Sequence, residues 1–123
     1  MCSFDDVMAA IAALEVDPRS ITPAQAAVRV GQLARAEKRL AALRLLHEPR
    51  AMEGKGWAVE GDKSPEDWLS RQTGRPVGQA AEELQAAKAV DQFPDTRRAL
   101  LEGKLSGRQV ATIVDAAKAD PAA

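Results

Sequence analysis

Alanine is the residue that most limits how this chain can fold, because it fills 25 of the 123 positions while the sequence has two Phe, two Trp and no Tyr. A core with so little bulk suits helices that pack close together better than a sandwich of bulky β-branched strands. The length is that of one domain. We therefore expect a single helical domain over residues 1–123, with a frayed tail at 118–123.

Start and stop signals for helices recur along the first half of the chain. Ser3 and Asp6 have the spacing of a capping box, and a short helix there should end at Asp17-Pro18. Thr22-Pro23, followed by Gln25, opens a helix that should end before the next proline, Pro49, and so should run over about 25 residues, 22–47. A helical wheel places its apolar stripe at Ala26, Val30, Leu33, Ala34, Leu40, Ala41 and Leu45.

Shorter helices are expected in the second half. Residues 48–63 have three Gly and one Pro without periodicity, which predicts a loop. Trp57 in this loop and Trp68 both lie beside apolar residues, so core anchoring is favoured over stacking on bases. Cap residues and periodicity predict helices over 64–74, 77–92, 95–103 and 106–117. The expected fold is all-α, with about six helices: one long helix in the N-terminal half packed with two helix-turn-helix-like pairs.

The sequence has one His, one Cys and no Asn, which removes most ways to build a metal site or a His-based catalytic dyad. His47 falls near the end of the long helix, where an imidazole meets the helix dipole, and no ligand partner stands at metal-binding spacing. We expect no cofactor, no metal and no catalytic residue. The lone Cys2 and the absence of a long apolar run predict a cytoplasmic protein that does not enter a membrane.

Several segments from about Val30 to Ala117 resemble a bacterial family. An Ala/Leu/Arg-rich helix and a Gly-Trp loop are followed by SPEDWLSRQTG, by GQAAEELQAAKAVDQFP, and by TRRALLEGKLSGRQVATIVDAA with its Leu-Glu-Gly-x-Leu-Ser-x-x-Gln pattern. In this order they resemble domain of unknown function 222, the 13E12-repeat family of high-GC Gram-positive bacteria. Three positions depart from the family pattern: Glu82 and Glu83 replace Arg-rich residues, and Pro76 replaces an apolar residue.

In this family the domain usually lies N-terminal to an HNH endonuclease module. The resemblance therefore implies either the N-terminal portion of a longer HNH-type protein or a stand-alone copy of its accessory domain. An HNH module needs His and Asn side chains to hold a metal and activate water. Because this sequence has no Asn, we expect the domain itself to be non-catalytic. The resemblance implies an accessory domain that is associated with DNA, with nuclease chemistry in a C-terminal module if the full-length protein has one.

Charge is distributed unevenly, which bears on DNA binding. Residues 1–18 have four acids and no base, whereas residues 19–50 have seven bases and two acids. A basic helix could follow phosphates, although a merely solvated face remains the alternative. A helix–Gly–helix unit over 96–117 adds Arg and Gln, which suit guanine and adenine edges. The candidate contacts to double-stranded DNA are Arg35, Lys38, Arg39, Arg97, Arg98, Arg108, Gln109 and Thr112.

A function of a different class stays open, namely a helical protein–protein interaction or dimerisation module without DNA binding. A helix this long could leave part of its stripe uncovered, and Glu37 could pair with Arg44 across a two-fold axis. Salt-dependent binding of duplex DNA would favour the DNA-associated accessory domain, and a mass that rises with protein concentration would favour the interaction or dimerisation module. The candidate residues of a weak homodimer interface are Val30, Leu33, Glu37, Leu40 and Arg44.

Overall fold

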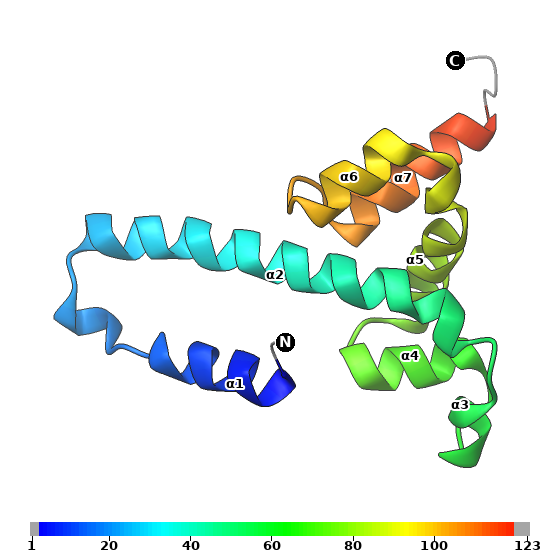
Figure 1. Ribbon diagram of the computed structural model, residues 1–123, viewed down its shortest axis with the longest axis horizontal. Helices are drawn as coiled ribbons and strands as arrows, with labels where there is room; N and C mark the ends of the chain where they lie inside the picture. Colours follow the sequence, from blue (N-terminus) through cyan, green and yellow to red (C-terminus); the bar gives the residue numbers. More distant parts are fainter. Residues whose placement is uncertain (1–2, 120–123) are drawn as a thin grey trace. The chain divides into compact units, whose positions relative to one another are not determined.

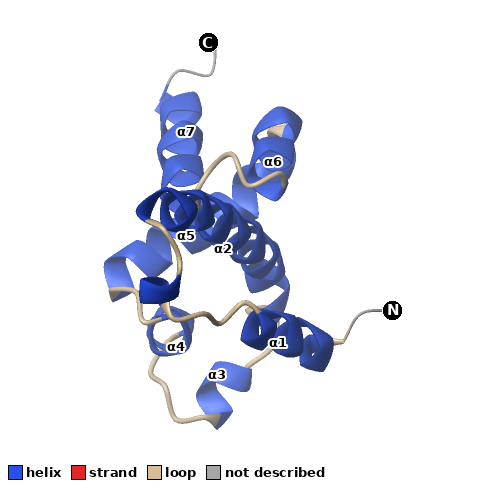
Figure 2. Ribbon diagram, turned by 90° about the vertical axis from the view of Figure 1, so that its left-hand side faces the viewer, coloured by secondary structure: helices blue, strands red, loops and turns tan. Residues whose placement is uncertain are grey.

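The computed structural model describes residues 3–119, and within them the chain forms helices and no strand (Figure 2). Seven α-helices and two 3-10 turns follow one another in this part of the chain (Figure 1). The all-α prediction is confirmed, and the expected count of about six helices is close. The elements are α1 (Phe4–Ala13), η1 (Pro18–Ser20), α2 (Pro23–Ala51), α3 (Gly56–Val59), α4 (Pro65–Thr73), α5 (Val77–Ala89), η2 (Val90–Gln92), α6 (Pro94–Leu101) and α7 (Gly107–Ala119).

The chain divides into two compact units, a first unit of Met1–Leu33 and a second unit of Ala34–Ala123. The boundary falls within α2, so the first unit consists of α1, η1 and the start of α2, and the second holds the later elements. Of the predicted frayed tail, residues 118–119 are the last residues of α7. Residues 120–123 and Cys2 lie outside the described residues.

Capping boxes predicted from the sequence begin three of the helices. At the start of α2 the Thr22 N–H donates to Gln25 Oε1 at 2.9 Å, and the Gln25 N–H donates to Thr22 Oγ1 at 3.1 Å. Each exchange satisfies two backbone donors that the first turn of a helix leaves free. The equivalent pairs are Ser3–Asp6 before α1 and Ser106–Gln109 before α7.

The end of α2 differs from the prediction. This helix is the longest, as expected, but it has 29 residues and continues through Pro49 to Ala51. Pro49 removes one backbone donor, yet the Met52 N–H reaches the Glu48 carbonyl at 3.0 Å, so helical pairing resumes just beyond it. The segment 48–63 is therefore not all loop, because it contains the last turn of α2 and the short α3.

The buried face of α2 also differs from the predicted stripe. Within the second unit only the C-terminal part of α2 contributes to the core, through Ala42, Leu45 and Glu48. The burial of Leu45 was predicted. The burial of Glu48 was not, because a helical wheel that selects apolar residues leaves out a charged one. The upstream stripe residues Val30, Leu33 and Leu40 are 66%, 43% and 48% exposed.

The main core of the second unit is rich in alanine. Five of its ten buried members are alanines from α2, α5 and α7, and the bulk comes from Leu45, Val90, Leu100, Val110 and Val114. Such small side chains let helices approach closely while the interior remains densely packed. This agrees with the expectation that close helix packing replaces bulky side chains.

A smaller cluster joins α4 to α5, and the two tryptophans differ in their relation to it. Leu69, Ala80 and Leu84 are buried there, and Trp68 packs against them, as predicted. Its indole N–H donates to Glu60. Trp57 is half-buried but is not among the described residues that pack on either cluster, so the predicted core anchoring applies to Trp68 alone.

Candidate nucleic-acid interface

The turn between α6 and α7 lies against α2 at Gly103. The φ angle of Gly103 is +77°, in the left-handed region. A Cβ at this position would lie 2.8 Å from Arg39 Cγ and 3.3 Å from Arg35 Cγ. Glycine alone gives both this conformation and this close approach. Two basic segments that are far apart in the sequence therefore meet at this turn.

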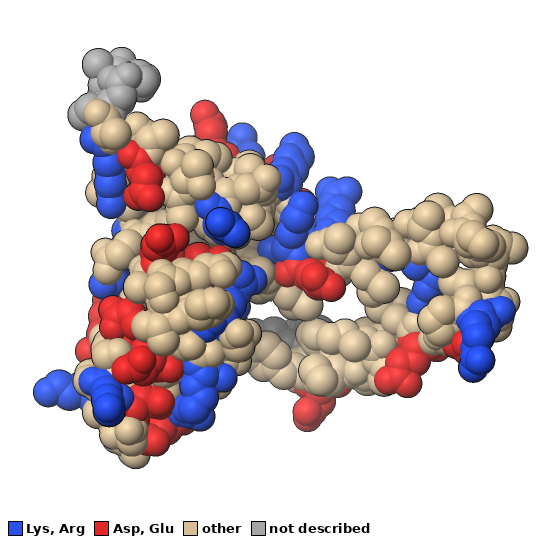
Figure 3. All heavy atoms as spheres, turned by 180° about the vertical axis from the view of Figure 1, so that it is seen from behind, with Lys and Arg blue, Asp and Glu red and all other residues tan. Residues whose placement is uncertain are grey.

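The surroundings of Glu102 show that further cations gather here. Lys104 Nζ lies 2.9 Å from Glu102 Oε2. The hydrogen bond from Lys104, with the positive charges of Lys104, Arg98 and Arg35, lowers the pKa of Glu102. Figure 3 shows Lys and Arg side chains gathered on this part of the second unit. The exposed side chains of Arg35, Arg39, Arg98 and Lys104 are called the basic cluster.

Sequence reasoning named three members of the basic cluster and missed Lys104. The signal for Lys104 was its place directly after Gly103, the glycine that follows the C-cap of α6. Lys38, predicted to share a face with Arg35 and Arg39, is half-buried. Arg97 forms an exposed ion pair with Asp91 at 3.2 Å.

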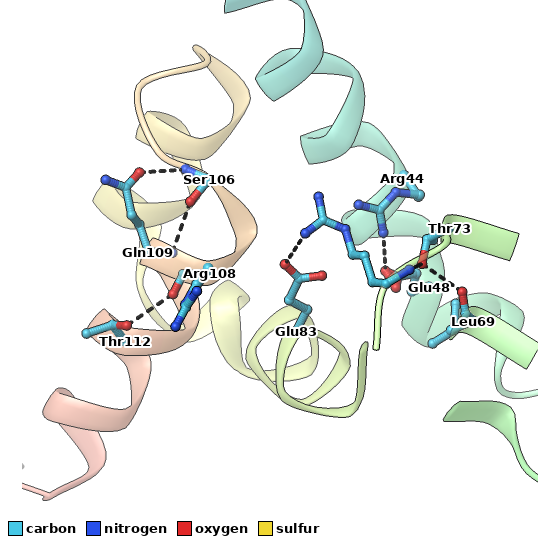
Figure 4. A network of polar contacts seen from close by, with 10 residues as sticks. Arg44, Glu48, Leu69, Thr73, Glu83, Ser106, Arg108, Gln109 and Thr112 are labelled. Carbon is cyan, nitrogen blue, oxygen red and sulfur yellow. Dashed lines mark hydrogen bonds and ion pairs between the residues drawn. The ribbon is translucent and has the colours of Figure 1, made fainter. Parts of the chain in front are cut away.

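The first turn of α7 uses two of the predicted base contacts for its own structure (Figure 4). Gln109 Oε1 accepts the Ser106 N–H at 2.8 Å, and the Thr112 hydroxyl donates to the Arg108 carbonyl at 3.1 Å. A glutamine that reads adenine needs both its carbonyl and its amino group. The cap already uses the carbonyl of Gln109, whereas Arg108 is exposed.

The predicted dimer residues are mostly exposed, with one exception. Arg44, which we expected to pair with Glu37 of a second copy, is half-buried and forms an ion pair with Glu48 of its own helix at 3.2 Å. Glu37 has no ion pair among the residues that the structure describes. The exposed members are Val30, Leu33, Glu37 and Leu40.

A second group of charges, which sequence reasoning missed, is buried beside the core. Glu48 and Glu83 are only 5% and 2% exposed. Glu48 pairs with Arg44 of α2, and Glu83 pairs with Arg75, which precedes α5, at 3.3 Å (Figure 4). These four residues are called the buried charge cluster.

Burial dominates the titration of Glu48. Loss of hydration disfavours its ionised form and raises its pKa to about 7. The positive charge of Arg44 opposes this shift, the negative charge of Glu83 adds to it, and Arg75 opposes it more weakly. The pairing with Arg44 thus offsets only part of the cost of burying this carboxylate.

Glu83 also explains why a glycine begins α7. A Cβ at Gly107 would lie 2.9 Å from Glu83 Oε1 and 2.8 Å from Leu45 Cδ1. Without a side chain at Gly107, the carboxylate of Glu83 comes close to the N-terminus of α7, where the helix dipole favours negative charge.

Two structural requirements bear on the described residues, a cluster of ligands for metal binding and a helix that could span a membrane. Within residues 3–119 there is no group of three or more His, Cys, Asp and Glu side chains that could hold a metal ion. His47 is exposed, and its Nδ1 lies 2.6 Å from the Leu43 carbonyl of the preceding turn. None of the described helices combines the length and the apolar character needed to cross a bilayer.

The fold and these sites define a small all-α domain with one exposed basic cluster and one buried charge cluster. A family model, the domain of unknown function DUF222, matches residues 27–123, and the chain belongs to this family. This confirms the family expected from the motifs. The family is uncharacterised and indicates no catalytic class. No curated protein and no solved structure matches the chain significantly.

Proposed function

We propose that this domain binds the backbone of double-stranded DNA through the basic cluster, as a non-catalytic accessory domain of an HNH endonuclease-type protein. The observation that carries the proposal is the close approach of Gly103 to Arg35 and Arg39. It brings Arg39 to the turn beside which Arg35, Arg98 and Lys104 surround the Glu102 carboxylate, on a chain whose net charge is −1.

The chemistry of the basic cluster favours phosphates as its ligands. Three of its four members are arginines, whose guanidinium groups can hold phosphate oxygens with two parallel hydrogen bonds. Because Gln109 Oε1 is occupied in its helix cap, the nearby base-reading candidate is poorly suited to its task. We therefore propose contact with the backbone that does not depend on base sequence.

The link to an HNH module rests on family membership and on the arrangement that the family resemblance implies. The sequence lacks Asn and has one His, so the nuclease chemistry would come from a separate module. DNA binding in a bacterium implies a cytoplasmic location. Metal-dependent cleavage of DNA by the purified chain would overturn the non-catalytic part of the proposal.

Titration of a short DNA duplex at several salt concentrations tests the DNA-binding part. Four phosphate contacts should give a slope of log K against log salt of about −3.6, since each contact contributes about −0.9. The triple variant Arg35→Gln, Arg39→Gln, Arg98→Gln should lose about 2.7 from the magnitude of this slope. Circular dichroism of each protein checks that the helices persist.

A matched control distinguishes an effect of the basic cluster on DNA binding from an effect of net charge. The triple variant Lys55→Gln, Lys63→Gln, Lys118→Gln removes the same charge from three exposed lysines outside the basic cluster and should bind like the wild type. If both triple variants bind equally, or if the wild type fails to bind at low salt, the basic cluster is only a solvated surface and the proposed function is wrong.

A further inference from the structure

The first unit carries an apolar stripe along α1. Its members recur at helical spacing, and Phe4, Met8, Ile11 and Leu14 are 87%, 63%, 45% and 50% exposed. None of the described residues up to Leu33 is buried. A helix of ten residues is only marginally stable in water unless its apolar face is packed. This stripe therefore calls for another surface to cover it.

The same unit also has a groove with a mainly apolar lining. It lies between the end of α1 and the start of α2, where Arg29 donates a hydrogen bond to the Leu14 carbonyl at 2.5 Å. Its volume is about 280 Å³. A groove of this size with a mainly apolar lining can take one or two apolar side chains. Its apolar lining includes Leu14, Val16, Ile21, Ala26, Val30 and Leu33.

We propose that a second copy of this chain occupies the groove. Two copies associate about a two-fold axis through residues 3–33, and the α1 stripe of each copy lies on the groove and the early α2 of the other. In such an isologous interface every contact is made twice, so one stripe and one groove per chain are enough to close the dimer.

The charges of the first unit favour this crossed pairing. α1 carries Asp5 and Asp6 and no cation, whereas the part of α2 in the first unit carries Arg29 and no carboxylate. Arg19 of η1 already pairs with Asp17, at 3.4 Å. Packing α1 on the early α2 of the partner brings opposite charges together. Packing α1 on α1 would instead bring like charges together, which costs free energy.

The exposed apolar surface of the first unit has eight bulky members, and a standard interface takes about 800 Å² from each partner. These members are 43–87% exposed: Phe4, Met8, Ile11, Leu14, Val16, Val28, Val30 and Leu33.

Sedimentation equilibrium of the full chain from low to high micromolar concentration tests the proposal. The mass of the wild type should rise from 13.1 kDa toward twice that value. Met8→Glu, which puts a charge in the stripe, should raise the dimer Kd by about 30-fold or more. Leu33→Glu, in the lining of the groove, should have the same effect. Ala9→Glu adds the same charge off the stripe and should leave the Kd unchanged.

Two results would overturn the proposal. A wild type that stays monomeric at every concentration would mean that the stripe is covered by something other than a second copy. A dimer that Met8→Glu and Leu33→Glu leave intact would mean that the interface lies elsewhere. Circular dichroism of the variants checks that the second unit remains helical. The measurement contains no DNA, so its outcome is independent of the proposed function.

Discussion

Replacing Glu48 by glutamine tests whether burial of this carboxylate lowers the stability of the fold. Glu48 is 5% exposed, and burial raises its pKa from the ordinary value of 4.5 to about 7. Between pH 4.5 and about pH 7 the folded chain holds a proton on Glu48 that the unfolded chain has already lost. The free energy of unfolding should therefore fall as the pH rises from 4.5 to 7 and level off above 7.

The size of the effect follows from the difference between the two pKa values. One pKa unit corresponds to 1.36 kcal/mol, so ionised Glu48 should cost about 3 kcal/mol above pH 7. Glutamine carries no charge at any pH, and its side-chain carbonyl can still accept a hydrogen bond from Arg44. Glu48→Gln should therefore exceed the stability of the wild type by less than about 1 kcal/mol at pH 5 and by up to about 3 kcal/mol at pH 8.

Urea denaturation followed by circular dichroism, repeated from pH 5 to pH 8, measures this difference. Subtracting the wild type from the variant cancels groups common to both proteins, such as His47. Glu82→Gln is the matched control, because it makes the same replacement at an exposed carboxylate, on α5. Its stability difference from the wild type should not vary with pH as that of Glu48→Gln does.

The reasoning fails if Glu48→Gln is less stable than the wild type at pH 8. That result would mean that the ion pair with Arg44 contributes more than the burial of Glu48 costs, as some well-packed buried pairs do. A difference that stays constant from pH 5 to pH 8 would also refute it, because the pKa of Glu48 would then be unchanged by folding.

Three further substitutions and one control test the packing and helix capping of the second unit by the same urea method. Gly107→Ala puts a Cβ 2.8 Å from a Leu45 methyl group and should lower the free energy of unfolding by about 1–3 kcal/mol. The control Gly78→Ala meets no atom within 4 Å and should not destabilise the fold. Equal effects of the two substitutions would refute the close packing at Gly107. Trp68→Ala should lower the free energy of unfolding by about 2 kcal/mol, which is less than the loss of a fully buried ring, because Trp68 is half-buried. A loss below about 0.5 kcal/mol would mean that the ring does not anchor α4 to the core. Ser64→Ala removes the N-cap of α4 and should cost about 1 kcal/mol; an unchanged midpoint would show that the cap contributes nothing.

Helix starts could be predicted because their signals are local. A capping box joins residues three apart, and the pair Thr22–Gln25 forms both of its hydrogen bonds as expected. The end of α2 was harder, because the rule against interior prolines does not say whether one more turn can follow. Here Met52 restores the pairing directly after Pro49.

The buried face of α2 could not be predicted in full, because a helical wheel ranks residues by polarity and cannot tell which length of a helix meets its neighbours. It assigned a stripe along the whole helix, whereas only the C-terminal part joins the core. It also excluded Glu48, although the i, i+4 spacing of Arg44 and Glu48 was visible in the sequence. The contact of Glu83 with Arg75 joins different segments and leaves no such local signal.

Gly103 and Gly107 show how a chain with few bulky residues completes its packing. Gly103 was expected to end α6, and its φ of +77° agrees, but its second role is to admit the aliphatic stems of Arg35 and Arg39. Gly107 in the same way admits the carboxylate of Glu83. Long charged side chains can pack through their methylene groups while their charged ends remain solvated or paired. Charged residues thus do part of the packing that a bulkier core would do, and polarity patterns therefore locate the helices better than the faces that they bury.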